Sequence, residues 1–299
     1  MSRLPVHFFI NPTAGRGRAA KRLKTIREIA RSKGVSLDVH ESREPGDMEA
    51  QVQSVAIRGA SVVIVAGGDG SIHEAVNGIL RSGTDTPLGV IPTGTGNDFA
   101  KAAGVTLDWE AATALLADRL LEASPPRPID VGVMNGRYFA NGAGIGFDAK
   151  VTALARQYRW PIGDLVYLFA IFKAFRDPIA TPSVRIRAGD YSWDGPLTLA
   201  SVSNGPWIGG MFHIAPMARN DDGQLELLIA APVTRRRIVT LLPKLMNGTH
   251  VHLPEISHQP ATALEIDCES DLLSHLDGEV QAPVSRFEIE LRPGALRLA

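Results

Sequence analysis

The fold is decided by the stretch SVVIVAGGDGS, residues 61–71. Residues 61–66 form a continuous apolar run rich in β-branched side chains, which predicts a strand buried on both faces. The loop Gly67-Gly68-Asp69-Gly70-Ser71 follows at once, and residues 72–80 have a helical pattern. A strand, a short glycine loop and a helix in this order are typical of a parallel sheet covered by helices.

The same order repeats on both sides of this stretch. Before it, a strand at 6–10 leads into a loop at 11–15; after it, a strand at 87–91 leads into a loop at 93–98. The spacing also predicts a strand at 36–40 and helices at 18–33, 47–58, 99–103 and 109–121. Ligands of such sheets bind beyond the carboxyl ends of the strands, where the three glycine-bearing loops would meet.

The pattern of polar and apolar residues changes after the proline-rich segment 124–128, which we interpret as a linker. Beyond it, short runs with alternating polarity predict strands at 129–134, 137–141, 183–188, 196–203, 224–230, 263–268 and 286–291. Helical patterns interrupt them at 234–247 and over part of 149–175. We therefore expect an N-terminal α/β domain with a parallel sheet over residues 1–128. A C-terminal β-sandwich domain would follow over 129–291.

Composition excludes several classes of protein. The chain has 299 residues, 44% of them apolar, so it is globular rather than disordered. A net charge of −1 argues against a nucleic-acid partner, although residues 1–40 alone carry nine Lys and Arg against two acidic residues. The single cysteine, Cys268, excludes an internal disulfide. Without an apolar run of about 20 residues or a secretory signal, we expect a cytoplasmic protein.

The carboxylate in each glycine loop is informative. Glycines let the backbone approach a ligand, and a helix N-terminus attracts phosphate. Asp69 beside a bound phosphate would repel it unless a cation lies between them, so Mg²⁺ bridging Asp69 and a nucleotide is one interpretation. The alternative is a turn in which Asp69 caps the helix. Asp98 in the second loop has the same context and favours the nucleotide interpretation.

Together these motifs resemble the diacylglycerol kinase catalytic-domain family, which includes bacterial lipid kinases and the sphingosine and ceramide kinases. The resemblance rests on NPTAG at 11–15, GGDGS at 67–71, GTGNDFA at 94–100, IDVG at 129–132 and DGE at 277–279. The motifs occur in the order of the family and cover nearly the whole chain. NAD kinases and phosphofructokinases share the glycine–aspartate loop but not the NDFA segment.

This resemblance implies a reaction and an architecture. The reaction is transfer of the γ-phosphate of ATP to a lipid hydroxyl, with Mg²⁺, and diacylglycerol is the expected acceptor, giving phosphatidic acid. The α/β domain is expected to be similar to that of NAD kinases and phosphofructokinases, with the active site in the cleft between two domains. Residues from about 292 to 299 are expected to pack back onto the first domain.

The resemblance also implies residue roles. Nucleotide contacts are expected from Asn11, Pro12, Thr13, Ala14, Gly15, Ser42, Gly67, Gly68, Asp69, Gly70, Ser71, Ile72, His73 and Thr95. Ser42 and Ser71 stand where the family usually has Thr and keep the hydroxyl, whereas His73 stands where Asn is frequent. Asp69, Asp98 and Asp130 match an acidic network that organises magnesium through water.

The catalytic base is expected from the DGE motif, where Asp277 and Glu279 are both candidates and a β-turn is the structural alternative. A structural magnesium site is implied at residues 219–224. There Asp222 would offer its carboxylate, and Arg219 and Gln224 their backbone carbonyls. A plain hairpin turn is the alternative.

The sequence says less about how the protein would recognise a lipid. Aromatic side chains crowd residues 158–175, flanked by Arg156, Arg159, Lys173 and Arg176, and the segment 234–247 joins three arginines to an apolar face. Both suit transient peripheral contact with the inner face of a membrane, although aromatic stripes are also typical of a core. We discount His250, His252 and His258 as a zinc site. A homodimer is possible.

Four functional alternatives stay open. Within the class, the acceptor could be phosphatidylglycerol or a sphingoid base. An NAD-kinase-like enzyme would use a soluble acceptor. A nucleotide-binding regulator would have lost transfer, against which the intact DGE motif argues.

Overall fold

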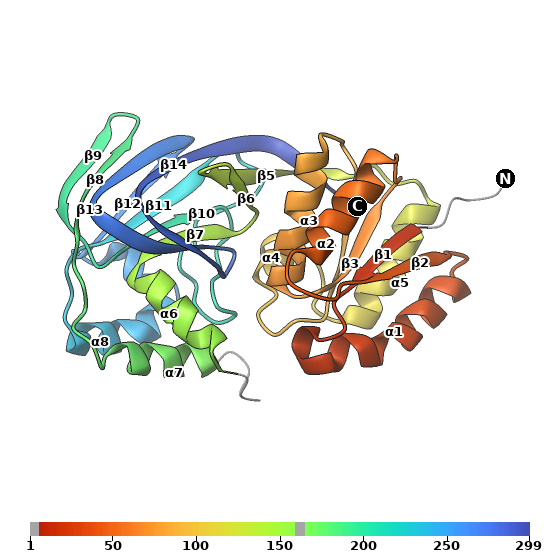
Figure 1. The fold of residues 1–299 in the computed structure, drawn as a ribbon, viewed down its shortest axis with the longest axis horizontal. Helices are drawn as coiled ribbons and strands as arrows, with labels where there is room; N and C mark the ends of the chain where they lie inside the picture. The colour runs from red at the N-terminus through yellow and green to blue at the C-terminus, as the bar shows by residue number, and fades with distance from the viewer. Residues whose placement is uncertain (1–5, 159–164) are drawn as a thin grey trace. The chain divides into compact units, whose positions relative to one another are not determined.

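The computed structural model describes residues 6–158 and 165–299, which divide into two compact units (Figure 1). The first unit runs up to Asp130 and also includes Pro293–Ala299; the second is Val131–Arg292. The chain crosses between the units twice, within β5 (Arg127–Met134) and within β14 (Glu279–Leu298).

The first unit contains a parallel sheet. Its strands β1 (Val6–Ile10), β2 (Leu37–Glu41), β3 (Val63–Gly67) and β4 (Leu88–Pro92) lie in the order β2-β1-β3-β4. The end of β14 adds to the far side of β4, where Leu298 pairs in parallel with Leu88. These parallel pairings confirm the predicted sheet. Strands β3 and β4 are buried along their whole length, so the sheet needs apolar cover on both faces.

Helices supply that cover on both faces of the sheet. They are α1 (Ala14–Ser32), α2 (Asp47–Ile57), α3 (Asp69–Ser82), α4 (Asp98–Ala102) and α5 (Trp109–Leu121). Helix α1 packs with α5, and α2 packs with α3. Phe8 and Ile64 point from the sheet into one apolar cluster with Ile26 of α1 and Leu116 of α5.

Three predicted boundaries were wrong in the first unit. Helices α1 and α3 begin at Ala14 and Asp69, several residues earlier than their hydrophobic periodicity indicated. The reason is that a helix starts where the backbone turns, and polar and glycine residues fill the first turn without adding to the apolar pattern. Arg127 and Pro128 belong to β5 rather than to a linker.

The second unit is built from antiparallel strands. They are β6 (Arg137–Phe139), β7 (Gly142–Gly146), β8 (Ser183–Ala188), β9 (Tyr191–Pro196), β10 (Leu199–Ser203), β11 (Leu225–Ala230), β12 (Ile256–Ala261) and β13 (Ala263–Leu276), with β14 and part of β5. The main path is β12-β11-β10-β7-β13-β14, while β8 pairs with β13 and β9. The strands β7, β9 and β12 were not predicted, because glycine or proline interrupts the strand signal in each.

Helices pack beside these strands in the second unit. They are α6 (Phe147–Arg156), α7 (Leu165–Ala174), α8 (Arg235–Met246) and the short 3₁₀ turn η1 (Thr249–His252). Phe147, Ile171, Ile238 and Leu242 share one apolar cluster with Phe212. A second cluster, including Phe139, Ile186, Leu227, Ile266 and Phe287, lies among the strands. The residues Arg159 and Trp160 of the aromatic segment lie outside the described part of the chain.

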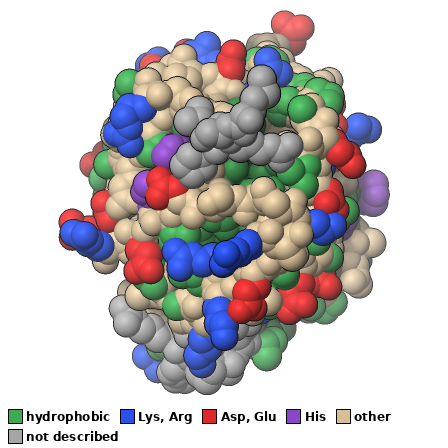
Figure 2. Space-filling model, turned by 90° about the vertical axis from the view of Figure 1, so that its right-hand side faces the viewer, with side chains coloured by type: hydrophobic (Ala, Val, Ile, Leu, Met, Phe, Trp, Pro, Cys, Tyr) green, Lys and Arg blue, Asp and Glu red, His purple; other side chains and the backbone are tan. Residues whose placement is uncertain are grey.

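Side chains of different kinds are mixed on one face of the described structure. On the face shown in Figure 2, basic, acidic and hydrophobic side chains are interspersed. Some basic residues of the first 40 are paired within the fold: Lys33 contacts Asp118 at 2.8 Å, and Arg22 lies over the ring of Trp109 at 4.9 Å. Part of the N-terminal positive charge therefore holds α1 to α5.

Candidate active site

The predicted nucleotide residues follow the carboxyl ends of four neighbouring strands. Asn11 follows β1, Ser42 follows β2, and Thr95 follows β4. Gly67 is the last residue of β3, and Gly68 comes directly after it. Since β2, β1, β3 and β4 are adjacent and parallel, these loops lie along one edge of the sheet in the first unit.

The two central loops touch through their backbones. A Cβ atom built on Gly94 would lie 2.4 Å from the Cα of Gly68, and one on Gly67 would lie 2.4 Å from the Cβ of Ser71. The N–H of Thr93 also donates to the carbonyl of Gly67 at 2.9 Å. A side chain would clash at Gly67 and Gly94, so the two loops approach each other through their peptide groups.

Asp69 and Asn97 join the same two loops. Oδ1 of Asp69 accepts a hydrogen bond from the N–H of Phe99 at 3.1 Å, at the start of α4. Asn97 has a left-handed backbone with φ of 53°, and its Oδ1 accepts from the N–H of Gly94 at 3.0 Å. Asp69 is half-buried, and its carboxylate caps the start of α4. The expected alternative, in which Asp69 caps its own helix, was wrong: Gly68 is the N-cap of α3, and Asp69 instead accepts from the start of α4. The magnesium interpretation stays a prediction.

The other two carboxylates of the predicted network are more enclosed. Asp98 is 6% exposed and forms an ion pair with Lys101 at 3.2 Å. Asp130 is 5% exposed, and its Oδ1 accepts from the N–H of Gly294 at 2.7 Å. Asp130 thus ties the first crossing of the chain to the returning C-terminal segment. Lys101 was not predicted as part of the site, because an i,i+3 partner is common on any helix.

The first loop is organised by Asn11. Its Oδ1 accepts from both the N–H and the hydroxyl of Thr13, at 2.9 and 2.7 Å, which shapes the turn through Pro12. Helix α1 then begins at Ala14, with Gly15 in its first turn, and the side chain of the N-cap residue Thr13 makes no capping hydrogen bond. The first N–H groups of α1 are the kind of donor that a phosphate binds.

The remaining predicted nucleotide residues differ in exposure. Thr95 is exposed in the second loop, and Ser42 is 9% exposed at the end of β2. Ile72 and His73 are 1% exposed inside α3, where Nε2 of His73 lies 3.4 Å from Nδ2 of Asn77. Ser71 is buried against Gly67, and Gly70 is half-buried in the first turn of α3. The side chains of Ile72 and His73 therefore belong to the buried side of α3.

The donor set of this edge fits Mg²⁺. Asp69, Asp98 and Asp130 offer only oxygen ligands, which is the preference of a hard cation, and Asp69 is the least enclosed of the three. Backbone N–H groups and hydroxyls nearby would suit the phosphates of a nucleotide. The residue types at this edge are compatible with a nucleotide and Mg²⁺, and both ligands stay predictions.

The DGE motif forms a tight turn between β13 and β14 in the second unit. Asp277 has φ of 50°, and its carboxylate accepts from the N–H groups of Ala140, Asn141 and Gly142 at 2.8–3.0 Å. Glu279 instead faces Arg156, with Oε2 2.5 Å from Nη1. The two carboxylates were equivalent in the sequence. In the structure, Asp277 holds the backbone, whereas Glu279 is partly exposed and paired with one arginine.

A buried histidine supports this turn. Nδ1 of His275 accepts from the N–H of Gly278, and Nε2 of His275 lies 3.1 Å from Oδ2 of Asp148. Gly144 makes room for the pair, since a Cβ there would lie 2.1 Å from the Asp148 carboxylate. His275 and Asp148 were not predicted, because they are 127 positions apart and match no motif.

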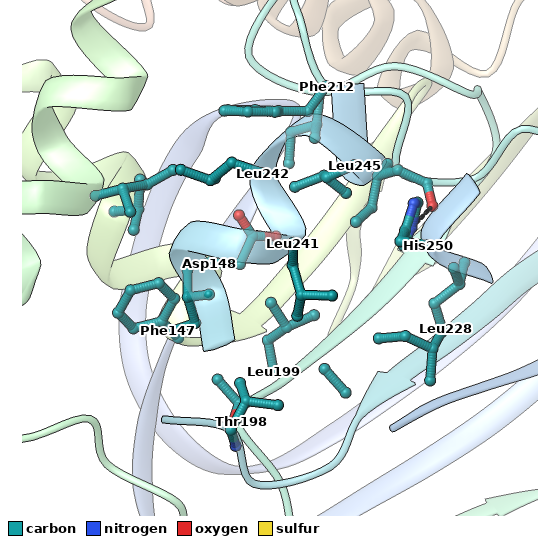
Figure 3. A pocket seen from close by; sticks show the side chains of 18 of the residues that line it. Phe147, Asp148, Thr198, Leu199, Phe212, Leu228, Leu241, Leu242, Leu245 and His250 are labelled. Atoms are coloured by element: carbon teal, nitrogen blue, oxygen red, sulfur yellow. Dashed lines mark hydrogen bonds between the residues drawn. The ribbon is translucent and has the colours of Figure 1, made fainter. Parts of the chain in front are cut away.

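An apolar cavity of about 120 Å³ lies beside the start of α6 in the second unit (Figure 3). Its wall includes Phe147 of α6, Leu199 of β10 and Leu241 and Leu242 of α8. Tyr167 also lines it, and the Tyr167 hydroxyl lies 3.9 Å from the position that a Cβ of Gly278 would take. Tyr167 therefore lies in the wall of the cavity and also next to the DGE turn.

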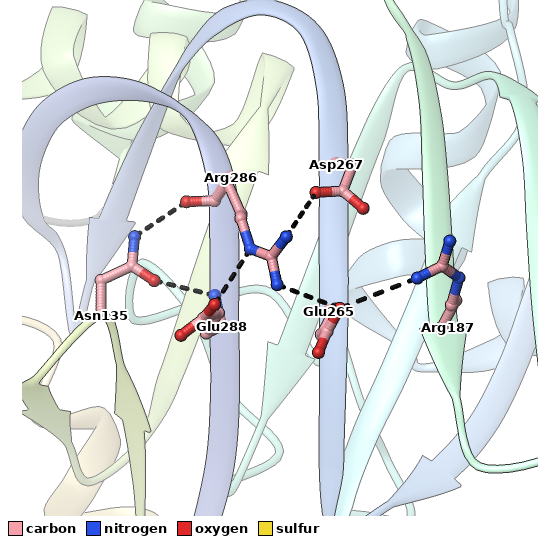
Figure 4. Close-up of polar contacts among 6 residues, drawn as sticks. All are labelled: Asn135, Arg187, Glu265, Asp267, Arg286 and Glu288. Atoms are coloured by element: carbon pink, nitrogen blue, oxygen red, sulfur yellow. Dashed lines mark hydrogen bonds and ion pairs between the residues drawn. The ribbon is translucent and has the colours of Figure 1, made fainter.

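Polar contacts hold together the antiparallel pair of strands β13 and β14, which is joined by the DGE turn (Figure 4). Arg286 pairs with Glu288 at 2.9 Å, Glu265 at 3.3 Å and Asp267 at 3.6 Å. Its hydrogen bond to Glu288 and the surrounding carboxylates raise the pKa of the Arg286 guanidinium. Asn135 adds two hydrogen bonds to the backbone of Arg286 and Glu288.

The predicted structural magnesium site at 219–224 is a turn on the surface. Oδ1 of Asp222 accepts from the N–H of Gln224 at 3.1 Å, and Arg219 pairs with Asp221 at 3.3 Å. Asp222 and Gln224 are exposed. This Asx turn suits the hairpin alternative, and the metal site stays a prediction.

The discounted side chains lie in ordinary surroundings. His250 is 4% exposed, and its Nε2 lies 2.9 Å from the Ile214 carbonyl; burial lowers the pKa of His250. His258 pairs with Glu226. Among the described residues, no helix has the length and hydropathy that crossing a bilayer requires.

Comparison with known proteins identifies relatives of both parts of the chain. Residues 5–133 match the model of the diacylglycerol kinase catalytic domain. Residues 141–299 match that of the YegS C-terminal NAD kinase beta sandwich-like domain, which confirms the predicted sandwich.

Among curated proteins, a diacylglycerol kinase of Mycobacterium tuberculosis is 32% identical over 96% of this chain and 92% of its own. One from Bacillus subtilis is 29% identical over 90% and 88%. A solved structure from Bacillus anthracis shares 26% identity with a TM-score of 0.81, covering 100% of this chain and 97% of that one. A diacylglycerol kinase structure from the same organism, 24% identical over the same shares, has a TM-score of 0.76 and supports the fold.

Proposed function

Because the chain belongs to the diacylglycerol kinase catalytic-domain family, and is therefore a kinase that uses ATP, we propose that it phosphorylates the free hydroxyl of diacylglycerol. The product would be phosphatidic acid. The observation that carries the choice of a lipid acceptor is the apolar cavity, because one of its lining side chains, Tyr167, reaches the DGE turn.

The nucleotide would bind at the loop edge of the first unit. The N-terminus of α1 and the peptide groups around Gly68 and Gly94 are suited to bind its phosphates. Asp69 would hold Mg²⁺ through water, and the ion, when bound, would neutralise charge on the β- and γ-phosphates. Asp98 and Asp130 support this edge through Lys101 and Gly294.

Glu279 is the better candidate for the base. Asp277 already accepts hydrogen bonds from three backbone N–H groups. Glu279 has one arginine partner among the described residues, and its side chain is about one-third exposed, at 32%. The lipid hydroxyl oxygen would bond to the γ-phosphorus while its proton passes to Glu279. The bond from the γ-phosphorus to the bridging oxygen would break, and ADP would leave. Arg156 would position the Glu279 carboxylate.

The cavity suits part of an acyl chain. Its volume of about 120 Å³ is slightly below that of a protein cavity known to hold benzene, about 150 Å³. Only the part of the acyl chain nearest the lipid headgroup would fit in the cavity without movement of α8. Leu241, Leu242 and Leu199 would contact that segment.

We also propose that the second unit touches the membrane through α7. Leu165, Phe169 and Phe172 are exposed on this helix at spacings of four and three residues, so they share one face. Lys173 lies beside them, and three arginines begin α8. Exposed aromatic and basic side chains favour an anionic bilayer surface, such as the inner face of the cytoplasmic membrane.

Transfer of labelled γ-phosphate from ATP to lipids in mixed micelles tests the proposal. The panel would contain diacylglycerol, monoacylglycerol, phosphatidylglycerol, sphingosine and ceramide, with NAD⁺ as a soluble acceptor. We expect labelled phosphatidic acid from the wild-type protein and none from Glu279→Gln. Label in another lipid would correct the acceptor. Label in NADP⁺ alone would overturn the lipid assignment.

A further inference from the structure

Three potential metal ligands lie together on the first two strands of the parallel sheet. His7 of β1 is directly opposite Asp38 of β2, and His40 follows two residues along β2 on the same face. Among the described residues, these three form the only group of at least three His, Cys, Asp or Glu side chains close enough to hold one ion. The group lies outside the nucleotide loops, at the opposite end of β1 from Asn11.

The three ligand atoms are mutually close. Nδ1 of His7 lies 3.0 Å from Nε2 of His40 and 3.3 Å from Oδ2 of Asp38, and Nε2 of His40 lies 3.2 Å from the same oxygen. With metal–ligand bonds of about 2.0–2.1 Å, the ligand atoms of a tetrahedral zinc site are about 3.3 Å apart. The observed triangle has nearly those dimensions without any movement.

Hydrogen bonding does not account for all three contacts. An ionised Asp38 only accepts, so both histidine nitrogens would have to carry a proton to satisfy it. Those two protons would then face each other across the contact between the nitrogens. If either nitrogen loses its proton, that nitrogen and the Asp38 oxygen are two acceptors in contact. A cation at the centre removes the conflict, because each atom then offers it a lone pair.

We propose that His7, Asp38 and His40 bind a divalent transition-metal ion of the Zn²⁺ class. Two imidazoles and one carboxylate are a donor set that selects Zn²⁺ over Mg²⁺, which prefers oxygen ligands. The site is thus distinct from the magnesium proposed at Asp69 and does not depend on the kinase assignment.

The surroundings support binding from solution. The side chains of His7 and His40 are 24% and 25% exposed and that of Asp38 is 46% exposed, so water can reach the site and complete the coordination. The ring of Phe9 stacks on His40 at 4.6 Å and 15°, which orients the imidazole. The positive charge of Arg58 acts on His7 and would oppose the ion.

A metal here would fasten β2, the edge strand, to β1. Strand β2 leads directly into Ser42, one of the predicted nucleotide contacts. We therefore expect Zn²⁺ to stabilise the folded first unit rather than to take part in phosphoryl transfer.

Calorimetric titration of Zn²⁺ into the metal-free full-length protein, in excess Mg²⁺, tests the site. We expect one ion per chain and a raised unfolding temperature. Co²⁺ should give the visible absorption of an ion with nitrogen and oxygen ligands. Asp38→Asn keeps the shape of the side chain, and His40→Phe keeps the stacking on Phe9. Each should weaken binding at least about 10-fold, the lower end of the cost of changing an outer-shell partner.

Two further variants sharpen the test. His252→Ala removes an exposed histidine in the second unit and should bind Zn²⁺ like the wild type. Arg58→Gln removes the opposing charge and should tighten binding. Absence of Zn²⁺ binding, binding that survives both Asp38→Asn and His40→Phe, or loss in His252→Ala would overturn the proposal. Should one strand variant fail to fold, the other and the Co²⁺ spectrum still decide. A protein that binds Zn²⁺ but phosphorylates no lipid would refute only the proposed kinase substrate.

Discussion

The backbone N–H of Gly278 donates to Nδ1 of His275 at 3.3 Å, in the centre of the DGE turn. A peptide N–H is always a donor, so this contact requires an unprotonated Nδ1 and places the ring proton on Nε2, facing Asp148. His275 is 2% exposed. The imidazole is thus a rigid support between α6 and the turn that holds Glu279.

Replacing His275 should separate turnover from nucleotide binding. His275→Ala removes the support behind Gly278, and we expect kcat to fall by about 10–100-fold, a cost typical of misplaced catalytic groups. The KM for ATP should change little. His275→Asn, which keeps an acceptor near Nδ1, should recover part of kcat. A drop in unfolding temperature with no kcat effect in the remaining folded protein would show a structural role alone.

The two carboxylates of the DGE turn should give different losses. Glu279→Gln should lower kcat by about 10²–10⁴-fold, the range for a lost general base, with an unchanged unfolding temperature. Asp277→Asn leaves one oxygen that can accept from Asn141 and Gly142 but puts an NH₂ group against the N–H of Ala140, and should destabilise the fold by about 1–3 kcal/mol. Steady-state kinetics and thermal unfolding of both variants check this. The reverse pattern would make Asp277 the base.

Asp69 combines a charge and a helix cap, and two substitutions distinguish them. Asp69→Asn keeps an oxygen for the Phe99 N–H but removes the charge, so kcat should fall by orders of magnitude and the Mg²⁺ requirement should rise. Asp69→Ala should add a loss of about 1 kcal/mol in stability from the missing cap. Titrations of activity against Mg²⁺ measure the first effect and denaturant unfolding the second. Equal Mg²⁺ dependence in wild type and Asp69→Asn would remove Asp69 from the metal site.

The contact between the glycine loops should not tolerate a methyl group. Gly94→Ala would put a Cβ 2.4 Å from the Gly68 Cα, so the loops must separate and ATP affinity should fall at least 10-fold, or about 1.4 kcal/mol. Gly142→Ala is the matched control, because its Cβ would make an ordinary contact at 3.4 Å. Nucleotide titration of both variants measures the difference. Similar affinities would show that the loops move apart freely.

Cys268 should react slowly with thiol reagents. Burial, with a smaller contribution from Asp267, raises the pKa of the Cys268 thiol to about 11. The reactive thiolate is then about one part in a thousand at pH 8. Alkylation by iodoacetamide should be slow in the native protein and fast in guanidinium, with a native rate that rises steeply above pH 9. Rapid native alkylation at pH 8 would contradict this.

Most of the parallel sheet could be predicted from the sequence, but few of its details could. Continuous apolar runs identified β3 and β4 because strands buried on both faces carry no polar positions. The helix starts at Ala14 and Asp69 were missed because first-turn residues are chosen for backbone geometry rather than burial. Strand β7 was missed because three of its five residues are glycines, which add no side chain to the pattern, and Gly144 among them leaves room for the His275–Asp148 pair.

The candidate site was predictable where a local motif carried it. Asp69, Asp98 and the DGE turn lie in short motifs that can be read along the chain. The different surroundings of Asp277 and Glu279, and the meeting of His7 with His40 across 33 positions, depend on strand pairing. No local pattern contains that information.

The order of synthesis has a consequence for the segment Pro293–Ala299. Its last residues pair beside β4, where the N–H of Ala299 donates to Leu88. A ribosome releases β1 to β4 well before this strand, so the side of β4 that it covers stays unpaired until the whole second unit has been translated. The first unit to emerge is thus the last to close, and a nascent chain stalled within the second unit would expose a parallel strand open to misassembly.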